Sequence, residues 1–406
     1  MLTRLTFLLL TVLLFNFNIY SAWFTQNSGV SSTLSSVYFT SPNVGYAAGD
    51  NGVILKTVDK GASWSRLNTG VNNNLYSVRF INIQKGFACG DNIILKTVDG
   101  GLTWQSYTNG ISSSLKSIYM LDENTAYAVG YGGLIFKTVN GGAEWNIILS
   151  SENSGFTSIY FLNSNTGYVT GIAGKYLKTI DGGLTWNAKP TDASKNFYSV
   201  QFLNQNVGYI TGGWVNSTVM KSVNGGESWD NLFSGATGVR LFSGSFIDEY
   251  NGYVCGRYGT IMKTIDAGGT WAAENSGVSS ALNSIQYLNQ NTAYAVGENG
   301  KIISTISVIG INQISSNIPD KFSLEQNYPN PFNPMTNVRF QISNGGFVKL
   351  VVFDMLGREA SVLVNEELYP GTYEVNFDAS NLSSGAYFYS LSAGEYSETK
   401  KMLMVK

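Results

Sequence analysis

One short motif recurs along much of the 406-residue chain and limits the fold more than any other feature. Each copy begins with Lys-Thr or Lys-Ser, continues through an Asp or Asn and a glycine turn, and ends at a tryptophan. The six tryptophans are spaced by 40, 41, 41, 43 and 42 residues and are Trp64, Trp104, Trp145, Trp186, Trp229 and Trp271. A period of this length indicates an array of similar supersecondary units.

Each unit contains the pattern of four short strands. In the second unit, LYSVRF (75–80) and GFACG (86–90) precede IILKTVD, a glycine turn and a strand that starts at TWQSY. The 45 glycines, 24 tyrosines and 22 phenylalanines, with only 13% charged residues, agree with a chain of many short strands and turns. Four strands in about 40 residues are typical of one β-propeller blade.

The last unit is incomplete, and its missing part stands at the other end of the chain. The second-strand motif occurs seven times, from GYAAG at residue 45 to AYAVG at residue 293, whereas the glycine turn with its tryptophan occurs six times. WFTQNSGVSS at Trp23 nearly repeats WAAENSGVSS at Trp271. We therefore expect an all-β, seven-bladed β-propeller of four-stranded blades, with six or eight blades as alternatives. The N-terminal strand closes the last blade, which would otherwise expose a sheet edge.

The glycine-turn motif resembles the Asp-box, or bacterial neuraminidase repeat, of sialidases, sortilins and plant-type photosystem II assembly factors. Its copies start at Thr57, Thr97, Thr138, Thr179, Ser222 and Thr264. Asn140 and Asn224 replace the aspartate in two copies. Asparagine keeps an acceptor oxygen but carries no charge, so we interpret the motif as structural. The regular tryptophans are expected to pack between blades, whereas Trp214, outside the series, is a candidate exposed contact.

Two positions of the first strand of each blade differ in their variability. The third position is always serine, a small residue that suits blades converging on an axis: Ser36, Ser77, Ser117, Ser158, Ser199, Ser243 and Ser284. The fifth position varies and holds Tyr38, Arg79, Tyr119, Tyr160, Gln201, Ser245 and Gln286. These varied residues form either a recognition surface or inter-blade packing. Our candidates for partner binding are Tyr38, Arg79, Tyr119, Tyr160 and Trp214.

Residues 1–22 have the pattern of a secretory signal peptide. One arginine precedes an apolar run from Leu5 to Phe15, which is too short to span a bilayer. Cleavage is expected after Ser21 or Ala22. A disulfide between Cys89 and Cys255 is not expected, because they lie on equivalent strands of distant blades.

The chain after about Pro319 predicts a second, smaller domain. Alternating runs such as VKLVVFD and TYEVNFD are typical of antiparallel strands in a small immunoglobulin-like sandwich. The segment resembles the type A C-terminal sorting domain of the type IX (Por) secretion system of Bacteroidetes-related bacteria. The resemblance rests on Asn327, Tyr328, Pro329, Asn330, Pro331, Phe332, Asn333 and Pro334, then on Gly357 in FDMLGRE, Gly371 in LYPGTYEV, Gly385 and Tyr387 in LSSGAYFYSL, and the closing KKMLMVK.

This resemblance implies a route and partners for the protein. It implies passage through the periplasm and outer membrane by the type IX machinery, with cleavage by its sortase-like peptidase. The product is then released or attached to surface lipopolysaccharide. We expect a signal peptide at 1–22, a propeller at 23–306, a linker at 307–320 and the sorting domain at 321–406.

Composition excludes several classes of function. The net charge of −2, without a basic run, argues against nucleic-acid binding. The absence of histidine removes Ser-His and Cys-His nucleophiles and His-ligated metals. No repeated oxygen-ligand loop predicts a metal, and no cofactor is expected. The main hypothesis is therefore a secreted or surface-exposed, non-catalytic binding or scaffold propeller, with an unknown surface protein or glycan as ligand. We expect it to be a monomer.

Two alternatives come from the repeat. A sialidase-like glycoside hydrolase would need three clamping arginines and catalytic acids, and the propeller offers only Arg66, Arg79, Arg240 and Arg257. The other alternative is a photosystem II assembly factor-like protein, because GYAAGDNGVILKTVDKGASW is closest to that family. We expect its fold to transfer but not its activity, because the export signal takes the chain away from a photosynthetic membrane.

Overall fold

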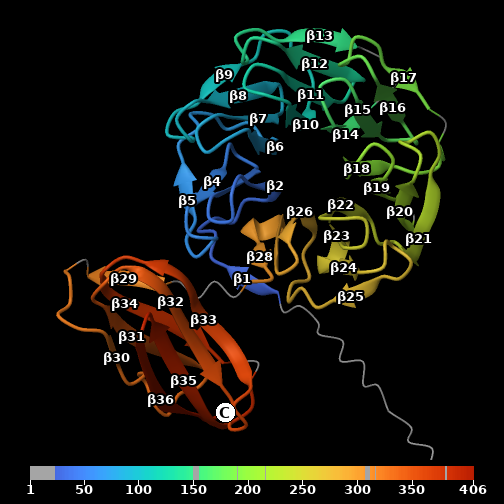
Figure 1. Ribbon diagram of the computed structural model, residues 1–406. Helices are drawn as coiled ribbons and strands as arrows, with labels where there is room; N and C mark the ends of the chain where they lie inside the picture. Colours follow the sequence, from blue (N-terminus) through green and yellow to red (C-terminus); the bar gives the residue numbers. More distant parts are fainter. Residues whose placement is uncertain are drawn as a thin grey trace, which may run out of the picture.

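The computed structural model shows a β-rich chain with seven sheets arranged in a ring and two further sheets in the C-terminal part (Figure 1). The described residues are 23–149, 155–189, 191–214, 216–306, 311–315, 317–379 and 382–406. The expected signal peptide, residues 1–22, lies outside them. Among the residues described, no helix has the length and apolar character needed to cross a membrane.

Six blades are built from consecutive strands, with the first strand innermost (Figure 1). Blade 1 contains β2 (Leu34–Phe39), β3 (Gly45–Gly49), β4 (Ile54–Thr57) and β5 (Ser65–Leu67). Blade 2 contains β6 (Leu75–Phe80), β7 (Gly86–Gly90), β8 (Ile93–Thr97) and β9 (Gln105–Tyr107). Blade 3 contains β10 (Leu115–Met120), β11 (Ala126–Gly130), β12 (Leu134–Thr138) and β13 (Asn146–Leu149).

The other consecutive blades follow the same order. Blade 4 contains β14 (Phe156–Phe161), β15 (Gly167–Gly171), β16 (Tyr176–Thr179) and β17 (Asn187–Ala188). Blade 5 contains β18 (Phe197–Phe202), β19 (Gly208–Gly212), β20 (Asn216–Ser222) and β21 (Asp230–Thr237). Blade 6 contains β22 (Leu241–Phe246), β23 (Gly252–Gly256), the 3-10 turn η1 (Arg257–Gly259), β24 (Ile261–Thr264) and β25 (Ala272–Glu274).

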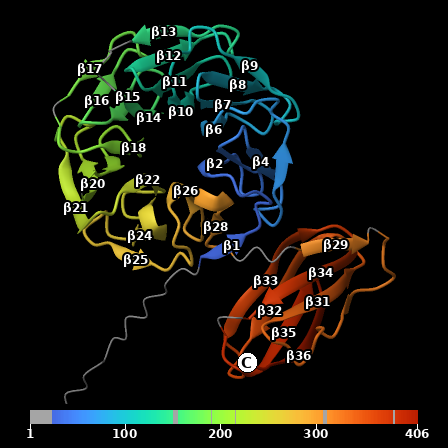
Figure 2. The ribbon, with the colours of Figure 1, turned by 180° about the vertical axis from the view of Figure 1, so that it is seen from behind.

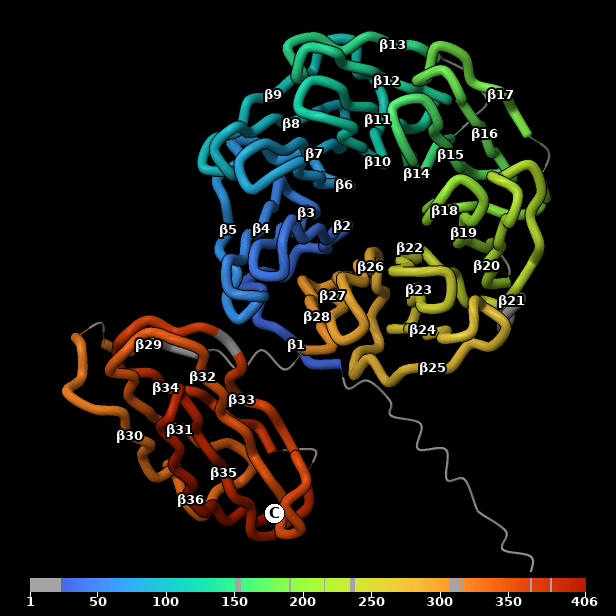
Figure 3. Tube along the Cα trace, viewed as in Figure 1, coloured from blue at the N-terminus to red at the C-terminus, as the bar shows by residue number. Residues whose placement is uncertain are grey.

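Blade 7 is completed by the N-terminal strand, as predicted. It contains β26 (Leu282–Asn289), β27 (Thr292–Gly297), η2 (Glu298–Gly300), β28 (Ile302–Ser304) and, on its outer edge, β1 (Phe24–Gln26). Strand β1 is antiparallel to β28, with Phe24 opposite Ser304 and Gln26 opposite Ile302. The tube view shows the two ends of the ring meeting here (Figure 3), and the view from behind shows the same closed ring (Figure 2).

Aromatic side chains fill the interfaces between blades. Tyr46 of blade 1 stacks on Phe80 of blade 2, with ring centroids 3.7 Å apart. Trp104 meets Phe80 edge-on at 6.1 Å. The same arrangement joins Tyr127, Phe161 and Trp186 between blades 3 and 4. The regular tryptophans therefore pack between blades, and aromatic contacts of this kind stabilise beyond their buried area.

The C-terminal part is a sandwich of two four-stranded antiparallel sheets. One sheet has the order β29 (Ile311–Ser315), β34 (Gly371–Asp378), β31 (Met335–Ile342) and β30 (Ser323–Leu324). The other has the order β33 (Glu359–Leu368), β32 (Gly346–Phe353), β35 (Gly385–Ala393) and β36 (Tyr396–Met404). Buried residues of both sheets, including Val338, Phe340, Leu350 and Tyr389, form one core.

Two details refine the expectations from sequence. Residues 311–315, which we expected within the linker, form β29 and pair with β34, with Ile311 opposite Val375. This pairing covers the edge of β34 that β31 leaves unpaired. Cys89 and Cys255 are both buried free thiols. Burial raises the pKa of each thiol, so neither is a reactive thiolate at neutral pH.

Candidate binding site

The serines at the third position of the innermost strands link each blade to the next. Ser36 Oγ accepts a hydrogen bond from the backbone N–H of Val78 at 3.3 Å. Ser284 Oγ accepts one from Val37 at 3.2 Å, which carries the chain of bonds from blade 7 back to blade 1. Ser77, Ser117, Ser158 and Ser243 accept equivalent bonds. Sequence reasoning found the small size of these residues but missed this role, for which the choice of serine over alanine was the signal.

The varied fifth positions of the innermost strands surround an axial cavity of about 440 Å³. All seven line it: Tyr38, Arg79, Tyr119, Tyr160, Gln201, Ser245 and Gln286. Residues two apart on a strand point to the same side, so these side chains follow the serines toward the axis. Blades 1 to 4 contribute three tyrosines and an arginine, whereas blades 5 to 7 contribute amides and a hydroxyl.

Four of these residues are engaged by a neighbouring blade. The Tyr119 hydroxyl donates to the carbonyl oxygen of Phe161 at 2.7 Å. Gln201 exchanges two hydrogen bonds with the backbone of Phe246, at 2.8 and 2.9 Å. Gln286 Oε1 accepts from the Phe39 N–H at 2.6 Å, and Ser245 Oγ accepts from the Tyr287 N–H at 3.0 Å. These four side chains therefore help to hold adjacent blades together.

The remaining three, Tyr38, Arg79 and Tyr160, have polar atoms that blade packing does not use. Arg79 Nη1 donates to the carbonyl oxygen of Val78 at 3.3 Å, and its guanidinium carbon lies 4.9 Å from the centre of the Tyr38 ring. In the described part of the chain, the hydroxyls of Tyr38 and Tyr160 make no hydrogen bond. The Tyr160 ring meets Tyr119 edge-on at 5.4 Å.

The electrostatics of the cavity are dominated by one cation. Of the described residues that line the cavity, Arg79 is the one with a charged side chain. It forms no ion pair with any described residue. Desolvation lowers the pKa of Arg79, yet a guanidinium remains protonated at neutral pH. Burial raises the pKa of Tyr119 and Tyr160, so both are neutral hydroxyl groups. The cavity therefore offers a positive charge beside neutral aromatic walls.

Trp214 lies apart from this cavity. It follows β19, is 52% exposed, and stacks with Arg240, whose guanidinium carbon is 3.8 Å from the ring centre. Arg240 Nε also donates to the Trp214 carbonyl oxygen at 3.2 Å. The structure therefore separates Trp214 from the other four binding candidates and gives it an exposed position of its own.

The cavity does not assemble the groups that a sialidase-like enzyme needs. Arg66 borders a different hollow beside β5, and Arg240 lies at Trp214. The described residues lining the axial cavity include no Asp or Glu. Nor do the described residues contain a group of three or more Cys, Asp or Glu suited to hold a metal ion.

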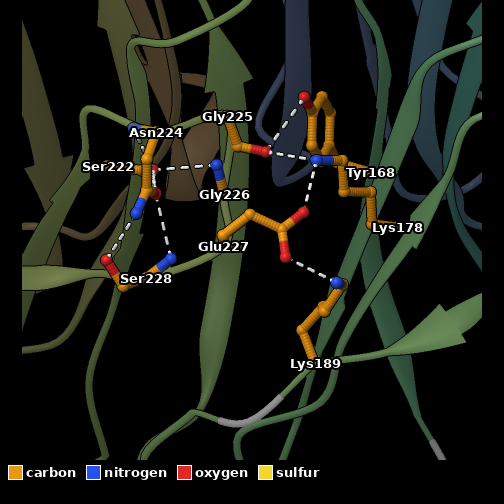
Figure 4. A network of polar contacts seen from close by, with 9 residues as sticks. All are labelled: Tyr168, Lys178, Lys189, Ser222, Asn224, Gly225, Gly226, Glu227 and Ser228. Atoms are coloured by element: carbon orange, nitrogen blue, oxygen red, sulfur yellow. Dashed lines mark hydrogen bonds and ion pairs between the residues drawn. The ribbon is translucent and has the colours of Figure 1, made fainter.

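The glycine-turn motif is held by hydrogen bonds to its acceptor oxygens (Figure 4). In blade 5, Asn224 Oδ1 accepts from the Ser228 N–H at 3.0 Å, and Ser222 Oγ accepts from the Gly226 N–H at 2.8 Å. In blade 2, Asp99 accepts the corresponding bond from the Thr103 N–H at 3.0 Å. The bonds from Thr103 lower the pKa of Asp99 to about 2. Asn and Asp thus perform the same turn-holding task.

In three blades the lysine of the motif binds the glycine turn of the next blade, a role that sequence reasoning missed. In Figure 4, Lys178 Nζ donates to the carbonyl oxygen of Gly225 in the next blade at 2.8 Å, and the Tyr168 hydroxyl donates to the same oxygen at 3.4 Å. Lys56 and Lys137 bind Gly100 and Gly182 in the same way. The presence of lysine in all six copies was the available signal.

The predicted sorting residues lie on the C-terminal sandwich. The buried Asn327 amide donates to the Pro329 carbonyl oxygen at 3.1 Å and to Thr336 Oγ1 at 2.9 Å. Phe332, also buried, pairs in parallel with Met404. Asn330 Oδ1 accepts from the Leu403 N–H, and the Tyr387 hydroxyl donates to the Ser383 carbonyl oxygen, both at 2.9 Å.

The rest of the sorting set occupies turns and strand starts. Tyr328 is 80% exposed, Pro334 accepts from the Ala379 N–H, and Gly357 has a φ of 76°, which favours glycine. Gly371 and Gly385 begin β34 and β35. The segment that includes Pro329, Pro331 and Asn333 therefore folds back onto the last strand, while its part in sorting stays a prediction.

Two family models match the chain. Residues 16–156 and 149–236 match a model described as photosynthesis system II assembly factor YCF48. Residues 326–406 match a secretion system C-terminal sorting domain. No curated protein matches the chain.

Solved structures show the same propeller fold. YCF48 from Cyanidioschyzon merolae is 19% identical, with a TM-score of 0.59, 70% of this chain covered and 98% of that chain. YCF48 bound to D1 peptide is 18% identical, with a TM-score of 0.61 and coverages of 71% and 96%. A GH74 xyloglucanase from Xanthomonas campestris is 12% identical, with a TM-score of 0.57 and coverages of 84% and 59%. At these identities the likeness concerns the fold alone.

Proposed function

Because this chain belongs to the photosynthesis system II assembly factor YCF48 family and ends in a type IX secretion sorting domain, we propose that it is an exported, non-catalytic binding propeller. Its ligand enters the axial cavity. The sorting domain indicates type IX export to the cell surface or the extracellular space. Release from the cell or attachment to lipopolysaccharide, after processing by the sortase-like peptidase, completes the proposal.

One observation carries the binding role. The fifth-position residues converge on one cavity, and Tyr38, Arg79 and Tyr160 keep polar atoms that form no hydrogen bond with a described residue of a neighbouring blade. Polar side chains gathered in a concave site are typical of ligand binding. The absence of carboxylates among the described lining residues supports binding over glycoside hydrolysis, which uses a pair of them.

The ligand classes we propose are a surface glycan or a surface protein. Among solved structures with this fold is YCF48 bound to D1 peptide, which supports a protein segment as the second class. The export domain argues against the assembly role itself, because it directs this chain out of the cell.

The experiment is a surface-binding assay with the purified protein and matched variants. Tyr160→Ala is expected to weaken binding to cell-surface material about tenfold, because tyrosine is enriched among the contact residues whose truncation costs more than about 1 kcal/mol. Tyr250→Ala is the control, since Tyr250 is 62% exposed and lies outside the cavity. Binding that survives Tyr160→Ala but is lost in Trp214→Ala would move the site to Trp214. If the purified protein binds no cell-surface material, the proposed binding function is wrong and a purely structural role is favoured.

A further inference from the structure

Among the described residues that line the axial cavity, one carries a charge. Arg79 comes from blade 2 and is flanked by Tyr38 of blade 1 and Tyr119 of blade 3. No carboxylate among the described lining residues compensates it. A desolvated guanidinium without a counter-charge favours an anionic guest, because the guest restores charge balance where water is restricted.

The guanidinium is held in place while most of its donors remain available. Its single hydrogen bond in the described structure is from Nη1 to the Val78 carbonyl oxygen, and the Tyr38 ring lies 4.9 Å from its central carbon. An arginine has five N–H donors in a planar fork that matches a carboxylate. One positive charge also balances one carboxylate, whereas a phosphate dianion would remain undercompensated.

The surrounding walls suit the body of a sugar. Tyr38, Tyr119 and Tyr160 present rings, and Ser158 and Ser199 add hydroxyls beside them. Aromatic rings offer flat apolar faces with polar edges, which match the C–H faces and hydroxyls of a pyranose ring. At about 440 Å³ the cavity has the size of a small-molecule site.

We infer that the axial cavity binds a carboxylate-bearing sugar, a uronate-type residue of a surface glycan, with Arg79 as the carboxylate anchor and Tyr38 and Tyr160 as the walls. This inference rests on the proposed function and names its ligand class. Tyr119 supports the wall through its bond to Phe161 and is a positioning residue.

The test is isothermal titration of the purified full chain with digalacturonate, digalactose and the methyl ester of digalacturonate. We expect digalacturonate to bind at least about tenfold more tightly than the two neutral disaccharides, since a charge-assisted bidentate bond is at stake. Arg79→Gln should remove this preference, and Arg79→Lys should retain part of it. Arg257→Gln, outside the cavity, should leave it unchanged.

The esterified sugar keeps the test valid if Arg79→Gln fails to fold, because it removes the charge from the ligand on unaltered protein. Equal binding of the acid and the ester, or no binding of digalacturonate, overturns the inference. So does a preference for a short peptide with a free carboxyl terminus over both digalacturonate and the amidated peptide. If the surface-binding assay still depends on Tyr160 in any of these cases, the proposed function stands and only the sugar assignment falls.

Discussion

Blade 7 and blade 5 have the same four-stranded sheet but are closed in different ways. In blade 5 the outer strand, β21, follows β20 directly in the chain, so a covalent turn keeps it in place. In blade 7 the outer strand, β1, comes from the other end of the propeller and is held by non-covalent contacts alone. The difference teaches that the stability of the ring depends on a short segment distant in sequence.

The contacts of β1 extend beyond its own blade. Trp23 is 8% exposed and meets Tyr253 of blade 6 edge-on at 5.6 Å. Gln26 Nε2 donates to Ser304 Oγ in blade 7, and Gln26 Oε1 accepts from Trp64 Nε1 in blade 1, both at 3.0 Å. Strand β1 therefore connects three adjacent blades, and its loss would free the edge of β28.

The largest predicted effect is on stability, and it distinguishes closure of the ring by β1 from ordinary packing between blades. Trp23→Ala should lower the free energy of unfolding by about 3–5 kcal/mol, as for a buried tryptophan elsewhere. It should also speed hydrogen exchange in β28 of blade 7, because β1 loses its anchor. The matched variant Trp104→Ala should increase exchange around blade 2. Identical exchange patterns in the two variants would contradict a special closing role for β1.

A smaller effect is expected at the polar contact between blades 7 and 1. Gln26→Met keeps most of the side-chain volume but leaves Trp64 Nε1 and Ser304 without their present partner. This substitution should lower the free energy of unfolding by about 1–3 kcal/mol, the range for a buried polar group left unpaired. Thr25→Met, at the exposed neighbouring position, should change stability by no more than about 0.5 kcal/mol. Equal effects in denaturant unfolding would show that Gln26 is not part of the closure.

The smallest effect at neutral pH concerns the glycine turns that blades 1 to 6 have and blade 7 lacks. The pKa values of Asp99 and Asp181 are lowered from 3.8 to about 2, first by the hydrogen bonds from Thr103 and Thr185. A carboxylate with a lowered folded-state pKa stabilises above its unfolded pKa, and this contribution is lost as pH falls through the folded value. The melting temperature should therefore drop between about pH 4 and pH 2.

The double variant Asp99→Asn and Asp181→Asn provides the comparison. It should melt close to the wild type at pH 7 and lose less stability on acidification, because asparagine does not titrate. The natural Asn140 and Asn224 show that the turn accepts this residue. An acid dependence identical to that of the wild type would place the titrating groups outside these two turns.

The local sequence patterns were sufficient to predict the strands of the propeller and their order along the chain. LYSVRF and GFACG are β6 and β7 with the bounds expected, because short strands between glycine turns are determined by nearby residues. The unequal count of motifs was sufficient to assign β1 to blade 7, since a missing strand and its sequence could both be read. The pairing of β29 with β34 was not foreseen, because which segment covers a sheet edge depends on the assembled sandwich.

The sequence by itself determined the repeat, the closing strand and the set of varied residues that face the axis, because all of these depend on local spacing. Only the tertiary structure decided which members of that set remain available to a ligand. Tyr119 and Tyr160 occupy the same position in adjacent blades, yet only the Tyr119 hydroxyl reaches a carbonyl oxygen of the next blade. Such bonds, and the isolation of Arg79 from any described carboxylate, depend on how the blades lie against one another, which no single repeat encodes.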